Sequence, residues 1–203
     1  MQDTIVKIRQ YESGDGSKVE DICCDTAFFG GSIDSVFCDR DLFAEIIVRP
    51  YLDHEPNNAL VAVSGGEVVG YLLGSIRDDF SRLAKLNQIR AAAKIAIGLL
   101  IRKYKEHPRT QEHILWLLFK SHSQRSDTPK NAAHFHLELL PNYRGLGVGS
   151  RLLAAFEDKL KGEHIDYVYA TGIESEYFPR AFTGRNGFQV LSRTAALKGG
   201  ACS

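Results

Sequence analysis

The chain has 203 residues, of which 44% are hydrophobic and 25% are charged, and its 25 basic residues balance 25 acidic ones. This composition is typical of a globular protein with a core, and it excludes a disordered, fibrous or disulfide-dense chain. Because there is no net positive charge, bulk electrostatic capture of nucleic acid is not expected, and we predict no nucleic-acid partner. The length fits one domain over residues 1–203 that contains an insertion.

The chain contains four cysteines, Cys23, Cys24, Cys38 and Cys202. They form no Cys-x-x-Cys pair and no Cys/His spacing suited to zinc, so we expect no metal site. Reduced thiols and the absence of a secretory signal predict a soluble, cytoplasmic protein. The most apolar run, residues 91–101, is interrupted by Lys94 and is shorter than the roughly 20 residues of a membrane span, so we expect no membrane partner.

The first elements follow simple periodicities. Residues 4–11 alternate apolar and charged side chains before a Ser-Gly-Asp-Gly loop, which predicts a strand. Apolar residues then recur at helical spacing from residue 17 until a Gly-Gly pair, so a helix is predicted within residues 17–31. A second helix is predicted over residues 42–48, with Asp39 or Asp41 as its N-cap and the following Arg-Pro pair as its end.

A hairpin and a helical segment follow. Two β-rich runs, residues 59–64 and 68–76, are joined by a short glycine connection and predict a β-hairpin. Residues 78–123 become rich in Ala, Leu, Lys and Arg, with apolar residues at helical spacing. They predict an insertion of two or three helices, broken at His107-Pro108. Strand character resumes over residues 133–140.

The last third alternates strands and helices again. A glycine-rich turn at residues 144–149 opens an amphipathic helix, which a strand over residues 165–171 follows. A short helix around residues 179–185 and a final strand at 188–191 complete the pattern. Strands that alternate with helices predict an α/β (α+β) class, with a mixed central β-sheet and helices on both of its faces.

The segment from Leu139 to Leu153 passes from strand through glycine turn to helix start. Backbone N–H groups at a helix N-terminus attract anions, and glycines let a phosphate approach the main chain. We therefore predict a phosphate or pyrophosphate site. A dinucleotide fingerprint fails because Ser150 takes the place of its last glycine, and the Gly-Lys-Ser/Thr of a P-loop is absent. A turn that only packs helix on sheet is the alternative.

Arg144, Gly147 and Gly149 match the acetyl-CoA motif Arg/Gln-x-x-Gly-x-Gly/Ala, and here the chain resembles the GNAT acetyltransferases. Residues 180–188 are similar to the family's A-x-x-F-Y-x-x-x-G-F ending. Residues 134–141, the Pro-Tyr-Leu segment at 50–52 and the insertion resemble a bacterial subgroup related to the acetyltransferase-like domain of O-GlcNAc hydrolases. The resemblance implies a GNAT fold, with the helical insertion between the third and fourth strands.

The resemblance also implies an acetyl-CoA-dependent N-acetyltransferase, whose acceptor is an amine of a small molecule or a protein. In this family the amides of the glycine turn hold the pyrophosphate of coenzyme A. The corresponding residues are Arg144, Gly145, Leu146, Gly147, Val148, Gly149 and Ser150. The pantetheine arm pairs like an extra strand with the strand before the turn, which implies Leu139 and Leu140. The side chains of Arg144 and Arg151 are candidates to add positive charge.

Direct acetyl transfer to an amine needs a base but no covalent intermediate, so no cysteine nucleophile is expected. His134, His136 and Glu138 are spaced by two residues, so an unbroken strand points all three to one face. Because burial raises a carboxyl pKa, Glu138 is our first choice for the general base and His136 the second. A structural role for each of them remains the alternative.

The family pattern is broken near the C-terminus. In this family a tyrosine usually acts as the general acid for the coenzyme A thiolate, and alignment places Thr183 at that position. The threonine side chain is shorter than that of tyrosine, and its hydroxyl is a weaker acid. Tyr177 is a candidate replacement, and Glu176 stands where an asparagine often contacts the cofactor. These departures favour an alternative function, a non-catalytic acyl-CoA-binding or protein-interaction module of the same fold.

Two further features concern the acceptor and the assembly. Asp34, Asp53 and Tyr51 are candidates to bind the acceptor amine. The insertion helices, including residues 115–119, are apolar enough to cover the acceptor site or to form the face of a homodimer. Core packing is the simpler explanation for these apolar residues.

Overall fold

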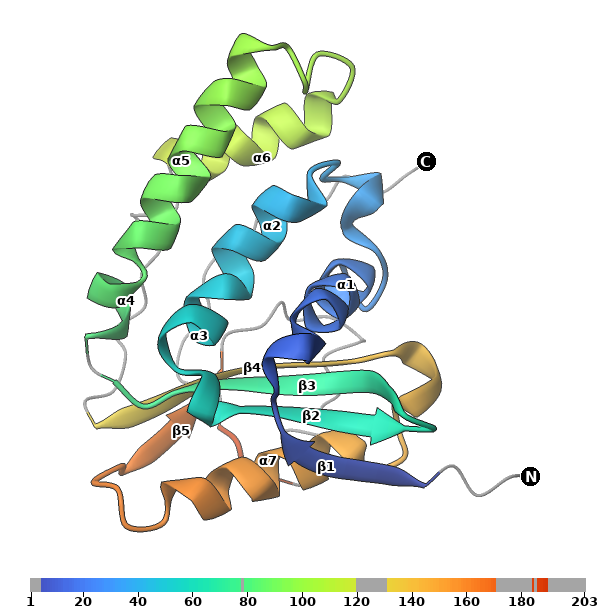
Figure 1. Ribbon diagram of the computed structural model, residues 1–203, viewed down its shortest axis with the longest axis vertical. Coiled ribbons are helices and arrows are strands. Elements are labelled where there is room, and N and C mark those ends of the chain that lie inside the picture. The colour runs from blue at the N-terminus through green and yellow to red at the C-terminus, as the bar shows by residue number, and fades with distance from the viewer. Residues whose placement is uncertain (1–4, 78, 120–130, 171–183, 185, 190–203) are drawn as a thin grey trace.

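A computed structural model describes residues 5–77, 79–119, 131–170, 184 and 186–189 (Figure 1). Its strands form one sheet in the order β1-β2-β3-β4-β5. They are β1 (Val6–Gln10), β2 (Ala59–Ser64), β3 (Glu67–Ser75), β4 (Ala132–Leu139) and β5 (Tyr167–Tyr169). The first four strands pair antiparallel and β5 lies parallel to β4, so the predicted mixed sheet and hairpin are confirmed.

Helices cover both faces of this sheet, as predicted (Figure 1). One face carries α1 and α3, with α2 beside them, and the other carries α7. The bounds are α1 (Gly16–Thr26), α2 (Arg40–Ile47), α3 (Arg49–His54) and α7 (Val148–Leu160). Successive side chains of a strand point to opposite faces, so Leu72 packs in the α7 core whereas Tyr71 and Leu73 pack in the α1 and α3 core.

Three helices separate β3 from β4 in the chain and extend beyond the sheet beside α2 (Figure 1). They are α4 (Phe80–Leu83), α5 (Lys85–Leu100) and α6 (Pro108–Phe119). A helical segment between the third and fourth strands agrees with the sequence, and Pro108 begins α6, where its missing N–H costs no helical bond. That this segment is an insertion relative to the family stays a prediction.

Two helix boundaries differ in informative ways from the sequence prediction. The Asp39 carboxylate accepts the N–H of Leu42 at 3.2 Å, so Asp39 rather than Asp41 caps α2. The Arg-Pro pair, residues 49 and 50, follows the end of α2 and also begins α3. Pro50 stands in the first turn of α3, a position that proline favours because its fixed φ suits a helix and no N–H is needed there.

The C-terminal strands are shorter than predicted. β5 covers Tyr167–Tyr169 rather than residues 165–171. Phe188 and Gln189 lie outside any strand, and residues 190 and 191 of the predicted final strand fall outside the described residues. The predicted short helix around residues 179–185 also lies outside them, except for residue 184.

Gly74 allows α7 to lie close against β3. A Cβ at this position would collide with the ring of Phe156 and approach the carbonyl of Asn58. We therefore expect Gly74→Ala to lower the free energy of unfolding by about 1–3 kcal/mol, because the core must expand to accept one methyl group. Urea denaturation measures this change. Gly14→Ala is the control, since no atom lies within 4 Å of a Cβ there; equal stability of the two variants would contradict the close contact.

Candidate functional site

The turn between β4 and α7 has a backbone that glycine favours. Gly145 and Gly147 adopt φ angles of +74° and +76°, in the left-handed region. Gly147 is the N-cap of α7, and the N–H of Arg151 donates to its carbonyl at 3.1 Å. A Cβ on either glycine would meet no atom within 4 Å, so the space in front of the turn is open.

The same turn presents a row of unpaired donors. Within the described residues, no N–H group of residues 145–150 donates to a protein acceptor. These six consecutive groups lie at or just before the N-terminus of α7, where the helix dipole adds partial positive charge. The arrangement suits phosphate oxygens, which accept several hydrogen bonds at once.

Arg144 turns inward instead of extending toward this open space. Its Nε donates to the Leu139 carbonyl at 2.8 Å and its Nη1 to the Gly30 carbonyl at 2.9 Å. Its Nη2 is buried and has no hydrogen-bond partner in the described part of the chain. Arg151 likewise donates from Nη2 to the Val6 carbonyl at 2.9 Å. Both guanidinium groups therefore anchor the turn and α7 to neighbouring main chain.

The free edge of β4 lies next to the turn. The N–H of Leu140 donates to the Val69 carbonyl of β3 at 3.0 Å, and its own carbonyl accepts an N–H from the following turn. Alternate residues of a strand direct their backbone groups to opposite edges, so those of Leu137 and Leu139 point away from β3. Among the described residues, β5 pairs with β4 only as far as His134. The edge available to an extended ligand is therefore at Leu137 and Leu139, whereas both backbone groups of the predicted Leu140 are in use.

The three polar residues of β4 share one face of the sheet, as their spacing predicted. Nδ1 of His134 lies 2.6 Å from the Tyr51 hydroxyl, and Nδ1 of His136 lies 3.2 Å from the Tyr71 hydroxyl. Nε2 of His136 lies 3.8 Å from Oε1 of Glu138. The side chains of His136 and Glu138 are 23% and 24% exposed, so the row is accessible at its edge.

Burial fixes the protonation of this row. It raises the pKa of Tyr51 and of Tyr71, so both hydroxyls stay protonated, and each shares a hydrogen bond with the Nδ1 atom it faces. It lowers the pKa of His134 and of His136 to about 4, so both rings are neutral at pH 7. A neutral ring that accepts at Nδ1 carries its proton on Nε2. In His136 the ring nitrogen that faces Glu138 is Nε2.

Glu138 is the group in this row that titrates near neutral pH. Burial raises its pKa to about 7, and the nearby Thr26 hydroxyl and the positive charge of Arg144 reduce that shift. The direction agrees with the sequence prediction. At pH 7 about half of the side chains are carboxylates able to accept a proton, which matches the requirement for a general base.

The three residues predicted to bind the acceptor amine have different surroundings. Asp34 pairs with Arg40 and Asp53 with Arg90, each at 3.0 Å, so neither carboxylate is free for an amine. Of the three acceptor candidates, only Tyr51 contacts the histidine row.

Several functional predictions lie outside the described residues, namely Thr183, Tyr177 and Glu176. In the described part of the chain, burial raises the pKa of Cys23 to about 12 and that of Cys24 to about 11, so neither thiol ionises readily. No group of three or more described His, Cys, Asp or Glu side chains is placed to hold a metal ion. None of the described helices has the length and apolarity to cross a membrane.

Sequence reasoning missed Tyr71 and Thr26, which contact His136 and Glu138. Tyr71 is completely buried in β3. Its signal was a hydroxyl within the otherwise apolar run of residues 68–74, but the strand pattern does not reveal its partner across the sheet. Thr26 ends α1, and only the packing of that helix on β4 brings it to the site.

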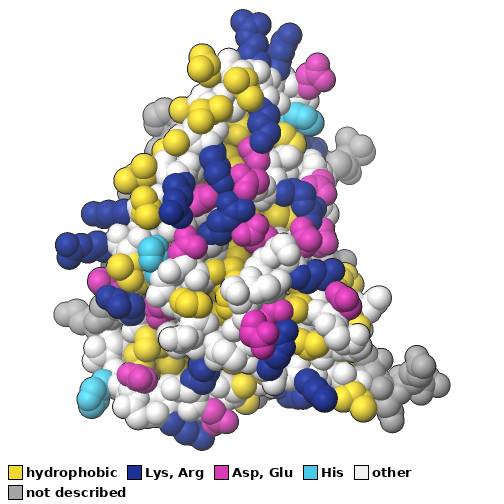
Figure 2. All heavy atoms as spheres, in the orientation of Figure 1, with side chains coloured by type: hydrophobic (Ala, Val, Ile, Leu, Met, Phe, Trp, Pro, Cys, Tyr) yellow, Lys and Arg dark blue, Asp and Glu magenta, His cyan; other side chains and the backbone are white. Residues whose placement is uncertain are grey.

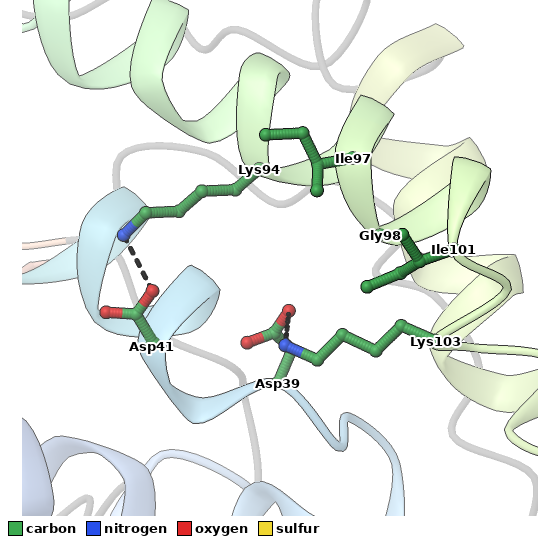
Figure 3. Close-up of a pocket in the computed structure, with 7 residues that line it drawn as sticks. All are labelled: Asp39, Asp41, Lys94, Ile97, Gly98, Ile101 and Lys103. Atoms are coloured by element: carbon green, nitrogen blue, oxygen red, sulfur yellow. Dashed lines mark hydrogen bonds and ion pairs between the residues drawn. The ribbon is translucent and has the colours of Figure 1, made fainter.

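A separate hollow lies between α2 and α5 (Figure 3). The polar groups on its wall are already paired. Nζ of Lys94 lies 2.7 Å from Oδ2 of Asp41, and Nζ of Lys103 lies 2.8 Å from Oδ2 of Asp39. These ion pairs join the helices, and the hollow has none of the unpaired donors found at the glycine turn.

Comparison with known proteins agrees with this geometry. The acetyltransferase (GNAT) family model matches residues 25–188. No curated protein sequence matches the chain. The crystal structure of SsHAT is 28% identical, with 91% of each chain covered and a TM-score of 0.66.

More distant solved structures share the fold. A GNAT-family acetyltransferase from Staphylococcus aureus Mu50 is 16% identical, with 93% of this chain and 87% of that chain covered and a TM-score of 0.54. PH1933 from Pyrococcus horikoshii OT3 is 15% identical, with coverage of 94% and 93% and a TM-score of 0.56. The mixed sheet with helices on both faces is thus an architecture that these proteins have in common.

Proposed function

The chain belongs to the acetyltransferase (GNAT) family, and we propose that it transfers the acetyl group of acetyl-CoA directly to a primary amine, with Glu138 as the general base. The observation that carries the proposal is the row of N–H groups at residues 145–150 that have no acceptor among the described residues, next to a strand edge and a carboxyl group of raised pKa. Acetyl-CoA supplies a thioester carbon for the amine to attack and a thiolate that leaves.

The chain's own groups bind the two ends of this donor separately. The N–H groups of residues 145–150 hold the diphosphate, through main chain rather than side chain. The backbone of Leu137 and the N–H of Leu139 hold the pantetheine arm, since the Leu139 carbonyl already accepts from Arg144. In this proposal the carrier lies along β4, the strand that holds Glu138.

The polar row prepares the acceptor. An amine with a pKa near 10 is almost wholly protonated at pH 7, so a base must remove a proton before attack. Glu138 accepts that proton, directly or through water. His136 has a pKa of about 4, which is too low for an efficient base at pH 7, so it acts as a neutral polar neighbour of Glu138, with Nε2 at 3.8 Å, rather than as the base. A general-acid role for Thr183 or Tyr177 stays a prediction.

Ligand-induced stabilisation and thiol release test the proposal. Acetyl-CoA and coenzyme A should raise the melting temperature, whereas NAD should not, because the dinucleotide fingerprint is incomplete. A panel of small-molecule and peptide amines should include at least one that accelerates thiol release. If acetyl-CoA stabilises the protein but no amine accelerates thiol release, the alternative of a non-catalytic acyl-CoA-binding module is supported. If neither acetyl-CoA nor coenzyme A stabilises the protein, the catalytic proposal and this alternative are both overturned.

Tyr71→Phe tests the role of His136. Without the hydroxyl, Nδ1 loses its hydrogen-bond partner and the ring is no longer held from β3, so the polar contact of Nε2 with Glu138 weakens. We expect the pKa of Glu138 to rise, which moves the midpoint of the kcat–pH profile upward by roughly 0.5 to 1 unit.

Tyr51→Phe is the matched control, because it removes the same hydroxyl from His134, two residues further along β4. Its midpoint should equal that of the wild type. An unchanged midpoint in Tyr71→Phe would show that the tyrosine has only a packing role.

The finer sequence predictions belong to the same proposal. They are a single catalytic domain over residues 1–203, a cytoplasmic location, a small-molecule or protein amine as acceptor, and membership of the subgroup related to O-GlcNAc hydrolases. The retained row of His134, His136 and Glu138 supports catalysis over binding alone, because a binding module needs no residue of matched pKa.

A further inference from the structure

The outward face of α5 is unusually apolar (Figures 1 and 2). Leu86, Ile89, Ile97 and Leu100 are 49%, 66%, 59% and 83% exposed, and Ala93 is exposed among them. At 100° per residue these five positions lie within one stripe, which we call the α5 stripe.

The opposite side of α5 is already packed. Ala91, Ile95 and Gly98 are buried, the first two in a cluster with Leu42 of α2. A helix that is apolar on two opposite sides is normally covered on both. Contiguous exposed apolar residues of this kind mark interaction surfaces.

The α5 stripe is symmetric about its centre. Its residues are spaced 3, 4, 4 and 3 apart and read Leu, Ile, Ala, Ile, Leu. In an antiparallel pair of identical helices crossing at Ala93, Leu86 faces Leu100 and Ile89 faces Ile97, and each contact occurs twice. This is the requirement for an isologous interface, in which one surface is complementary to itself. The small residue at the centre allows the two helices to approach.

We propose that the α5 stripe binds a second copy of this chain, with the two α5 helices antiparallel and a two-fold axis through Ala93. The occupant is a second copy, rather than an unrelated protein, because the order of large and small side chains is the same from either end. The interface lies on α5, whereas the side chains of the previously considered residues 115–119 are not described.

The charges around the α5 stripe fit this arrangement. Residues 80–105 contain seven basic and no acidic side chains. The antiparallel register places Lys85 opposite Ile101, Arg90 opposite Ala96 and Lys94 opposite Ala92, so no two cations face each other. It also brings the exposed Glu106 of one copy to the end where the other copy exposes Arg82 and Lys85. In a parallel pair of helices, each basic residue would instead face the same basic residue of the other copy.

The area is sufficient for a specific contact. Covering four large aliphatic side chains that are about half exposed or more removes on the order of 500 Å² per copy, or about 1,000 Å² in total, the lower limit for a stable interface. We therefore expect a dimer that dissociates on dilution rather than an obligate one.

Complementary single variants test the register. Ile89→Lys and Ile97→Glu each place a charge in the apolar stripe and should weaken the dimer more than 10-fold, as measured by sedimentation velocity from about 1 to 200 µM. An equimolar mixture should form a heterodimer, because the introduced lysine of one copy then faces the introduced glutamate of the other. Leu99→Glu is the control, since Leu99 is 50% exposed but lies off the stripe, and it should dimerise like the wild type.

A cross-link tests the axis independently of affinity. Ala93→Cys should form an intermolecular disulfide on oxidation that neither the wild type nor Gln88→Cys forms. A wild type that stays monomeric at 200 µM, a dimer that Ile97→Glu leaves intact, or a mixture that does not associate would each overturn the proposal. Binding of monomeric protein to anionic phospholipid vesicles that Ile97→Glu abolishes would also overturn it, by assigning the stripe to a lipid surface.

Discussion

Gly147→Glu is expected to abolish binding of acetyl-CoA, with an affinity loss of more than 100-fold. Two effects act together. A residue other than glycine is strained at φ +76°, by about 1–2 kcal/mol, and relief of this strain distorts the start of α7. The new carboxylate also stands beside the unpaired N–H groups of residues 145–150, where it repels a diphosphate and competes for its donors. Isothermal titration calorimetry measures the loss.

Two controls separate charge from backbone strain. Gly147→Ala carries the strain without the charge, so it should bind acetyl-CoA more weakly than the wild type but measurably. Gly162→Glu makes the same replacement at a positive-φ glycine near the C-terminal end of α7, with open space around it, and should leave affinity unchanged. Undiminished affinity in Gly147→Glu would mean that the carrier binds elsewhere.

Glu138→Gln is expected to lower kcat by about 100-fold or more, with little change in the affinity for acetyl-CoA. The amide keeps the shape of the side chain but cannot accept a proton from the amine. In the wild type, the carboxylate form increases as the pH rises through the pKa of about 7, so kcat should rise over the same range. The variant should lose this rise. Steady-state thiol release from pH 5.5 to 9 gives the profile.

His136→Gln distinguishes the two candidate bases. If His136 were the base, its pKa of about 4 would make the wild-type profile flat above pH 5, and His136→Gln would be the more damaging variant. With Glu138 as base, His136→Gln keeps a rise near neutral pH and shifts its midpoint. A Glu138→Gln profile identical to that of the wild type would exclude Glu138 from the base role.

Local sequence rules recovered much of the site because its parts are close in the chain. The spacing of His134, His136 and Glu138 fixes a shared face in any straight strand. The glycine turn follows directly, since positive φ angles at Gly145 and Gly147 are a local steric matter. Of the two residues predicted to pair with the pantetheine arm, Leu139 lies on the free edge, whereas the N–H of Leu140 already donates to Val69, because the strand pattern does not say which neighbour takes each N–H.

The sequence by itself determined the class of the fold, the order of the main strands and helices, and the position of the glycine turn before α7, because each depends on periodicity or on backbone sterics within about ten residues. Only the tertiary structure decided the neutral state of the histidines, because it depends on their burial, and the partners of their Nδ1 atoms, which are hydroxyls of Tyr51 and Tyr71 from other elements. The inward direction of Arg144, toward the Gly30 carbonyl, and the exposure of the α5 stripe are also properties that only the tertiary structure shows. Hydrogen-bond partners and burial are set by contacts between distant segments, and no short stretch of sequence contains both members of such a contact.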